Sequence, residues 1–287
     1  MVTRAEASVK LRAVPRAQIS ALQRDRWVSY PASEAGLERL GELLETPARV
    51  RMPCVLIYGM SGTGKSMLLE KFQRDSAKKV GRPTGRRTIV AAQMPPVPQV
   101  RSLYAEIVRA LDGGARSAGR FHELQSAAVG MLKHASARML IIDEIQHLLS
   151  CNAREQRAAL NAIKSLANTL RMSIVAAGTH EAVHVMRYDP QIASRFEQME
   201  LPVWGETEEL WRFAAGYVRL LPSRLGADLD QRVIACLLEL TDGITGRVTD
   251  VLRRAAAHAI ATRSNRITLD TLQYVGAHLR IIINQRA

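Results

Sequence analysis

The stretch "LIYGMSGTGKSMLLEKF", residues 56–72, determines how the rest of the chain is interpreted. It contains the pattern G-x-x-x-x-G-K-[ST], in which glycines let backbone amides turn toward a phosphate and the next helix directs its positive end there. The required context is a strand before the loop and a helix after it, and the apolar run 54–58 and the helical pattern of 65–75 supply both. We therefore predict a nucleotide-phosphate loop. Its residues are Gly59, Met60, Ser61, Gly62, Thr63, Gly64, Lys65, Ser66 and Met67.

Two side chains of this loop have expected chemical roles, and a later strand adds two more. Lys65 is expected to reach the outer phosphates and Ser66 to ligate Mg²⁺. The apolar run "MLIIDEIQHL", residues 139–148, would deliver Asp143 to the carboxyl end of a strand beside the loop. Asp143 would hold Mg²⁺ through water. Glu144 would orient and deprotonate an attacking water, and its alternative is a helix N-cap or a surface acid.

Two further candidates stand near the ends of later elements. Thr179 ends the apolar run "MSIVAAGT" and could position the water or contact the outer phosphate, with His180 as the competing candidate. The alternative for Thr179 is a helix N-cap. Arg195 precedes the last predicted strand, from which it could stabilise the γ-phosphate of a neighbouring subunit. Arg187 is the second choice for this role, and a surface salt bridge is the alternative.

Alternation of apolar strands and amphipathic helices continues through residue 204 and then stops. Such alternation predicts an α/β fold, a P-loop NTPase with a parallel sheet and helices on both faces. Residues after 205 show helical periodicity only, which predicts a small all-helical lid domain. We expect three parts, a basic N-terminal arm (1–35), a nucleotide-binding domain (36–205) and the helical lid (206–287). Arg247 opens a lid helix, from which it could contact bound nucleotide.

The charge balance favours a polyanionic partner. Lys and Arg number 40 against 27 Asp and Glu, a formal net charge of +13, and cations placed on phosphates release condensed counterions. The densest basic run joins the phosphate-loop helix to the second strand, and a solvated loop is its alternative. Its candidate DNA contacts are Lys78, Lys79, Arg82, Arg86 and Arg87. No aromatic residue is interleaved, so contact with the DNA backbone is favoured over base stacking.

Neither a membrane nor an oxidising compartment is indicated. No apolar run approaches the roughly 20 residues of a membrane-spanning helix, and the first 20 residues lack an apolar secretion core. The three cysteines are odd in number and far apart, so neither a disulfide framework nor a zinc site is indicated. We expect a cytoplasmic protein without a membrane partner.

The sequence resembles an AAA+ ATPase in the order of its motifs. These are the phosphate loop, "IIDE", Thr179, "SRF" and the Gly-x-x-x-Arg of the helical tail. The segments "LIIDEIQHLL", "AAGTHEA" and "ASRFEQMELPVW" look like the TniB family of transposition ATPases, relatives of TnsC and MuB. The resemblance extends from about residue 24 to the end of the sequence. It implies ATP and Mg²⁺ as cofactors, and it carries catalytic roles onto Glu144, Lys65, Thr179 and Arg195.

The resemblance also implies a function. Members of the family bind ATP, form rings or helical filaments on double-stranded DNA, and direct a DDE transposase to a target, often with a TniQ-like partner. We expect an ATPase that regulates transposition and whose hydrolysis drives disassembly. The alternatives are another DNA-associated AAA+ ATPase, such as a helicase loader, and a nucleotide-gated binding module with little turnover.

Overall fold

A computed structural model describes residues 16–79, 88–112, 120–222 and 225–284. Contacts between residues divide the chain into two units. One unit comprises residues 32–201, and the other combines the residues up to 31 with those from 202 onward. The first unit is α/β and the second is mainly helical, as predicted for the fold class.

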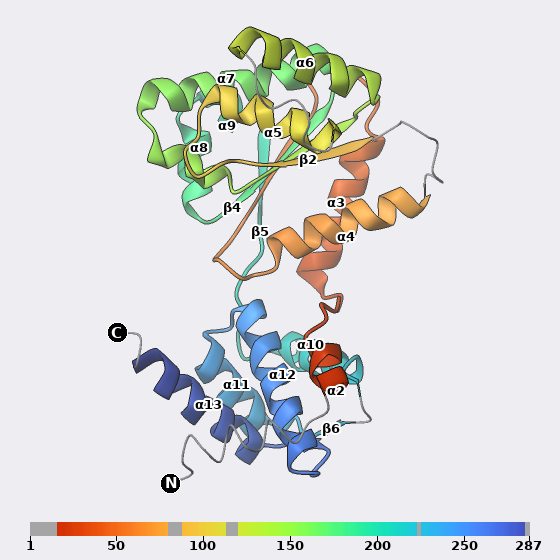
Figure 1. The fold of residues 1–287 in the computed structure, drawn as a ribbon, viewed down its shortest axis with the longest axis vertical. Coiled ribbons are helices and arrows are strands. Elements are labelled where there is room, and N and C mark those ends of the chain that lie inside the picture. The colour runs from red at the N-terminus through yellow and green to blue at the C-terminus, as the bar shows by residue number, and fades with distance from the viewer. Residues whose placement is uncertain (1–15, 80–87, 113–119, 223–224, 285–287) are drawn as a thin grey trace. The chain divides into compact units, whose positions relative to one another are not determined.

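Five parallel strands form one sheet in the order β2-β3-β4-β1-β5 (Figure 1). The strands are β1 (Cys54–Tyr58), β2 (Ile89–Gln93), β3 (Met139–Asp143), β4 (Ser173–Gly178) and β5 (Phe196–Glu200). Every residue of β4 is buried, and β1 and β3 are buried except at their last residues. Continuous apolar strands of this kind are expected where helices cover both faces of a parallel sheet.

The order of the strands assigns the helices to faces. The chain leaves β1 for β2 at the far edge of the sheet and returns through β3 and β4. Such crossovers are right-handed. The helix that connects β1 to β2 in one direction along the sheet therefore lies on the opposite face from the helices that connect β2, β3 and β4 in the other direction. Figure 1 shows α3 and α4 on one side of the sheet and α5, α6 and α7 on the other. The helices of this unit are α3 (Pro31–Glu45), α4 (Lys65–Lys79), α5 (Val100–Asp112), α6 (Phe121–His134), α7 (Ala153–Leu170), α8 (Glu181–Arg187) and α9 (Pro190–Ala193).

The second unit is built from helices around its own apolar core. Its helices are α2 (Arg16–Leu22), α10 (Glu208–Arg219), α11 (Gln231–Thr241), α12 (Thr245–Ala261) and α13 (Leu269–Asn284). Leu210, Leu237 and Leu252 are fully buried in this core. The expectation of helices alone needs one correction, because β6 (Gly226–Ala227) and β7 (Arg266–Ile267) form a parallel ladder. Two-residue strands are too short to produce an alternating apolar pattern, so periodicity does not reveal them.

Within the predicted N-terminal arm, residues 16–31 are folded onto the helical unit, whereas residues 32–35 belong to α3 of the α/β unit. Leu22 of α2 is 3 % exposed within the core of that unit. The Tyr30 ring lies 4.7 Å from the Trp204 ring, which in turn lies 4.9 Å from Phe213. Aromatic pairs at such distances add to the stability gained from area burial. Residues 16–31 therefore pack as part of the helical unit.

No helix among the described residues combines the length and apolar character needed to cross a bilayer.

Replacing Leu140 by alanine tests the packing of the sheet. Leu140 on β3 is 0 % exposed, so the shortened side chain should leave a cavity and lower the free energy of unfolding by about 2–5 kcal/mol. Urea titration monitored by circular dichroism measures this change. Leu149→Ala is a matched control, because Leu149 is 37 % exposed and should cost much less. Equal losses for the two variants would contradict the assigned burial.

Candidate functional site

The phosphate loop follows β1 and depends on glycine geometry. Gly59, Gly62 and Gly64 have φ angles of 155°, 85° and 99°, which residues with a Cβ rarely adopt. A Cβ on Gly59 would also lie 2.4 Å from the carbonyl oxygen of Leu201, so a side chain is excluded there. The sharp turn after the strand is therefore specified by these glycines.

Internal hydrogen bonds hold the loop around Lys65. The Lys65 ammonium donates to the carbonyl oxygens of Gly59 at 2.9 Å and Met60 at 2.8 Å. Thr63 is completely buried, and its hydroxyl donates to the Met60 carbonyl at 2.9 Å. Burial lowers the pKa of Lys65, while Asp143 and Glu144 oppose that shift. A largely buried ammonium held by neutral carbonyls gains stabilisation from a bound anion.

The first turn of α4 supplies the other predicted loop residues. The helix begins at Lys65, so its free backbone amides lie directly after the loop, where they favour negative charge. Ser61 and Ser66 are exposed beside Met60, whose side chain is 44 % exposed. Met67 follows them and is half-buried. The loop and helix thus form a surface to which a phosphate has access.

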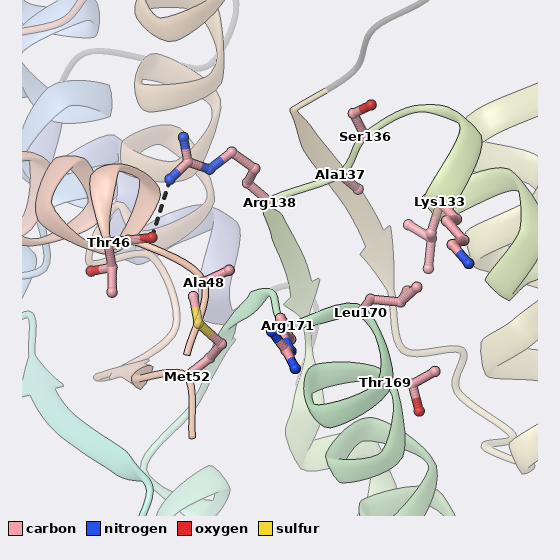
Figure 2. A pocket seen from close by; sticks show the side chains of 11 residues that line it. Thr46, Ala48, Met52, Lys133, Ser136, Ala137, Arg138, Thr169, Leu170 and Arg171 are labelled. Carbon is pink, nitrogen blue, oxygen red and sulfur yellow. Dashed lines mark hydrogen bonds between the residues drawn. The ribbon is translucent and has the colours of Figure 1, made fainter. Parts of the chain in front are cut away.

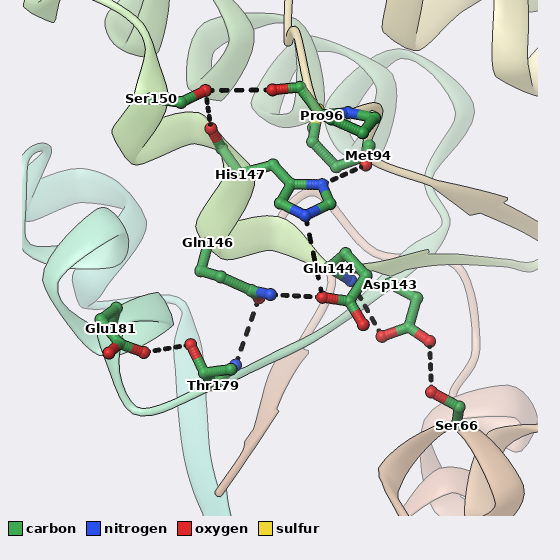
Figure 3. A network of polar contacts seen from close by, with 10 residues as sticks. All are labelled: Ser66, Met94, Pro96, Asp143, Glu144, Gln146, His147, Ser150, Thr179 and Glu181. Carbon is green, nitrogen blue, oxygen red and sulfur yellow. Dashed lines mark hydrogen bonds and ion pairs between the residues drawn. The ribbon is translucent and has the colours of Figure 1, made fainter. Parts of the chain in front are cut away.

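Ser66 and Asp143 meet across the sheet edge. The Ser66 hydroxyl donates to Oδ2 of Asp143 at 2.7 Å, and Oδ1 of Asp143 accepts the Glu144 backbone N–H at 2.8 Å (Figure 3). A hydroxyl and a carboxylate are hard oxygen ligands that fit Mg²⁺, which usually keeps several waters and phosphate oxygens. No group of three or more His, Cys, Asp or Glu side chains that could hold a metal occurs among the described residues.

Glu144 is held by a glutamine that sequence reasoning did not identify. Glu144 adopts the left-handed conformation, with φ 57° and ψ 37°, before the 3₁₀ helix η1 (Ile145–Ser150). The Gln146 side-chain amide donates to Oε2 of Glu144, and Gln146 Oε1 accepts the Thr179 backbone N–H at 3.2 Å (Figure 3). Gln146 therefore links the carboxylate after β3 to the end of β4.

The end of β4 is shaped to receive Gln146. A Cβ on Gly178 would lie 2.4 Å from Gln146 Oε1 and 2.8 Å from the Ala182 Cβ, so only glycine leaves room for the glutamine. His147 flanks Glu144 on another side, with its Nε2 4.0 Å from Glu144 Oε2 and its Nδ1 2.7 Å from the Met94 carbonyl oxygen. The only sequence signal for Gln146 is its position two residues after Glu144.

Both candidates at the end of β4 lie at the same sheet edge as the loop. The Thr179 hydroxyl donates to Glu181, and this hydrogen bond lowers the pKa of the Glu181 carboxyl. His180 lies 3.9 Å from Glu200 and makes an edge contact with the Tyr58 ring. The N-cap of α8 is His180, so Thr179 is not its capping residue.

The predicted arginines are divided between the two units. Arg195 precedes β5, at the amino edge of the parallel sheet, and donates to the Asn168 side chain at 2.6 Å. Arg187 is exposed at the end of α8. Arg247 belongs to the helical unit and forms an ion pair with Asp242. Each arginine remains a prediction as a nucleotide contact.

The predicted DNA run is described at its beginning only. Lys78 is exposed near the end of α4, and Lys79 ends that helix. Arg82, Arg86 and Arg87 lie outside the described residues. Their contact with DNA stays a prediction.

Comparison with known proteins adds a family and a fold. The model of the family described as "Bacterial TniB protein" matches residues 18–206, more than half of the chain. A search of curated proteins gives no match.

Several solved structures share the fold at low sequence identity. The Aeropyrum pernix ORC1 protein in complex with DNA has a TM-score of 0.69 at 20 % identity, covering 91 % of this chain and 69 % of that one. Drosophila ORC bound to DNA has a TM-score of 0.63 at 18 % identity, covering 96 % and 74 %. The Thermotoga maritima RuvB Holliday junction branch migration motor has a TM-score of 0.54 at 14 % identity, covering 89 % and 72 %.

The bridging role of Gln146 has a kinetic consequence. Gln146→Ala removes the donor to Glu144 and the acceptor from Thr179, so the carboxylate loses its fixed position. We expect the kcat of ATP turnover to fall about tenfold to hundredfold. The KM for ATP should stay nearly unchanged, since Lys65 and Ser66 are untouched. Steady-state phosphate release measures both constants.

A second substitution separates the two hydrogen bonds of Gln146. Gln146→Glu keeps an acceptor for the Thr179 N–H but loses the donor to Glu144 and adds a like charge. Its kcat should fall at least as far as that of the alanine variant. Wild-type kcat in Gln146→Glu would show that the bond to Glu144 does not matter for turnover.

Proposed function

The chain belongs to the bacterial TniB family and has the AAA+ ATPase fold, and from this premise we propose that it is an ATP-hydrolysing, DNA-binding regulator of transposition. The observation that carries the proposal is the 2.7 Å hydrogen bond between Ser66 and Asp143. It joins the phosphate loop to the strand end that also carries Glu144. The phosphate loop after β1 and the metal-binding oxygens and base after β3 lie at the same edge of the sheet, an arrangement that suits nucleotide hydrolysis.

Each residue of the cluster has a distinct role in this proposal. Lys65 exchanges its bonds to the Gly59 and Met60 carbonyls for oxygens of the outer phosphates. Ser66, and Asp143 through water, would hold Mg²⁺, which would supply charge stabilisation to the phosphates. The backbone amides at the start of α4 bind the inner phosphates. These contacts fix ATP at the carboxyl edge of the sheet.

Water activation falls to Glu144. Its carboxylate accepts a proton from the attacking water, and Gln146 fixes the direction of that carboxylate from the other side. Thr179 contributes through its backbone N–H, which holds Gln146 at 3.2 Å. A structural change at the end of β4 would thus alter the position of the Glu144 carboxylate through the side chain of Gln146.

The site is proposed to be shared between subunits. Arg195 lies at the amino edge of its own sheet, opposite the loop edge, so it is suited to the γ-phosphate of a neighbouring subunit. A head-to-tail contact of this kind generates rings or helical filaments. Bound ATP would then favour assembly, and hydrolysis would favour disassembly.

Double-stranded DNA is the proposed polymer on which the subunits assemble. The net charge of +13 supports a polyanionic partner, and the similar Aeropyrum pernix ORC1 protein was solved in complex with DNA. Lys78, Lys79, Arg82, Arg86 and Arg87 are proposed backbone contacts. A DDE transposase, with or without a TniQ-like protein, would be the partner recruited to the assembled protein.

Two other functions make different predictions. A helicase loader would share the nucleotide and DNA chemistry but would bind a helicase instead of a transposase in a pull-down. A nucleotide-gated module would use ATP to hold a conformation, and turnover would be incidental. The hydrogen-bonded placement of Glu144 favours turnover over the module, because a module needs no oriented base.

Replacing the base tests hydrolysis directly. Glu144→Gln should retain ATP binding, because Lys65, Ser66 and Asp143 remain. Its turnover should fall by a factor of about 10²–10⁴, the usual contribution of a general base. Phosphate release and equilibrium binding of a fluorescent ATP analogue measure the two properties. On the proposed function, assemblies of this variant on DNA should also outlast those of the wild type after ATP is diluted. Unchanged turnover would contradict the role of Glu144.

Mixing two inactive variants tests the shared site. Glu144→Gln retains Arg195, and Arg195→Ala retains Glu144, so a heterologous interface between them rebuilds one intact site. Random co-assembly in equal amounts should restore about a quarter of wild-type turnover. The control mixes Glu144→Gln with Lys65→Ala, in which every subunit lacks either the base or the loop lysine, and should restore nothing. If the first mixture also stays inactive while sedimentation shows co-assembly, Arg195 does not act in trans.

A further inference from the structure

A second concave site lies at the amino edge of the sheet, opposite the phosphate loop. The segments that enter β1, β3 and β4 line a cavity of about 310 Å³ (Figure 2). Its apolar lining includes Met52, Leu132 and Leu170. Lys133, Arg138 and Arg171 supply three cations, and all three are exposed.

The charge of this edge contrasts with that of the opposite edge. None of the described residues lining the cavity carries a carboxylate. The segment 46–53 before β1 adds Arg49 and Arg51, again without an acid. The carboxyl edge instead gathers acids, namely Asp143, Glu144, Glu181 and Glu200. Glu45, the last residue of α3, adjoins this segment, but cations outnumber acids at the amino edge.

Helix ends account for part of this charge. The helices α3, α6 and α7 all end at this cavity, and each C-terminus carries a partial charge of roughly −0.5 that cations stabilise. Three ends supply roughly −1.5, whereas the lining side chains supply three full positive charges. A positive surplus remains after the helix ends are neutralised.

The cations are also available for a ligand. Lys133 and Arg171 form no ion pair and no side-chain hydrogen bond with another described residue. Arg138 donates once, to the Thr46 carbonyl oxygen at 3.1 Å. Elsewhere in the same unit, Arg39 and Lys71 are paired with carboxylates at 2.5–2.6 Å. The cavity thus differs from an ordinary surface of paired charges.

We infer that this amino-edge surface, defined by Lys133, Arg138 and Arg171, binds backbone phosphates of double-stranded DNA. The hydroxyls of Ser136 and Thr169 line the same cavity and can donate to phosphate oxygens. The lining contains no aromatic side chain among its described residues, which suits contact with the backbone and not base stacking. Lys78 lies near the end of α4, which runs back from the loop to this edge, so the predicted basic run begins there.

The inference rests on the proposed DNA binding and deepens it. Within one subunit ATP would occupy the carboxyl edge and DNA the cavity at the amino edge, while Arg195, bonded to Asn168 beside that cavity, is kept for the nucleotide of a neighbour. The ligands therefore use different residues. Lys65 at the carboxyl edge and the cations of the amino-edge surface should therefore affect ATP binding and DNA binding separately. Removing the amino-edge charges should weaken DNA binding while leaving DNA-independent ATP turnover unchanged.

The test uses the full chain with a non-hydrolysable ATP analogue and a fluorescein-labelled DNA duplex of random sequence. Anisotropy measures the Kd between about 50 and 200 mM salt. Lys133→Gln/Arg171→Gln should reduce the slope of log Kd against log salt by about 2, since each lost phosphate contact removes about 0.9. Adding Arg138→Gln should reduce it by about one more unit. Glutamine removes the positive charge and keeps a polar, though shorter, side chain.

Arg154→Gln/Arg157→Gln is the matched control, because both arginines are exposed on α7 near its opposite end. This variant loses the same charge and should keep the slope close to that of the wild type. An amino-edge variant with a wild-type slope overturns the inference, and so does an equal reduction in the control. Absence of salt-dependent DNA binding in the wild type itself would instead overturn the proposed function. Wild-type ATP turnover measured without DNA in both variants verifies that each has folded.

Discussion

The hydrogen bond between Ser66 and Asp143 joins two segments that are 77 residues apart and depends on the parallel arrangement of the strands. β1 and β3 flank β4, so their carboxyl ends open at one edge. The register pairs Tyr58 with Gly178 and Ile142 with Ala176, which keeps the three strand ends level. An antiparallel β3 would carry Asp143 and Glu144 to the opposite edge. The chemistry of the site therefore depends on the buried, parallel arrangement of these strands.

Level strand ends also allow one side chain to connect two of them. Gln146 contacts Glu144 and the Thr179 backbone, and the absence of a side chain at Gly178 leaves space for it. Thr179 in turn bonds Glu181 at the start of α8, and α8 is followed by α9 and Arg195. Hydrogen bonds thus connect the proposed base to the start of α8, and beyond that point the chain itself leads through α9 to Arg195.

The sequence was most informative where a motif and its context agree. The strand–loop–helix around Gly59 to Ser66 and the apolar strand ending at Asp143 predicted the fold class, which is confirmed. The family resemblance is confirmed by the match over residues 18–206. Gln146 could not be predicted, since its role arises from a left-handed turn at Glu144 and from contact with a distant glycine. The amino-edge surface escaped prediction for a similar reason, because Lys133, Arg138 and Arg171 converge only in the folded sheet. The packing of Tyr30 likewise depends on Trp204 and Phe213, far along the chain.

The central claim is that ATP is bound at the carboxyl edge of one subunit and completed by a neighbour on DNA. Electron microscopy of the protein with duplex DNA and a non-hydrolysable ATP analogue tests it most directly. The account predicts a ring or filament with the triphosphate against Lys65 and Ser66, and with Arg195 of the adjacent subunit at the γ-phosphate. Monomers on DNA, or a nucleotide enclosed by a single subunit with Arg195 remote from every phosphate, would contradict it.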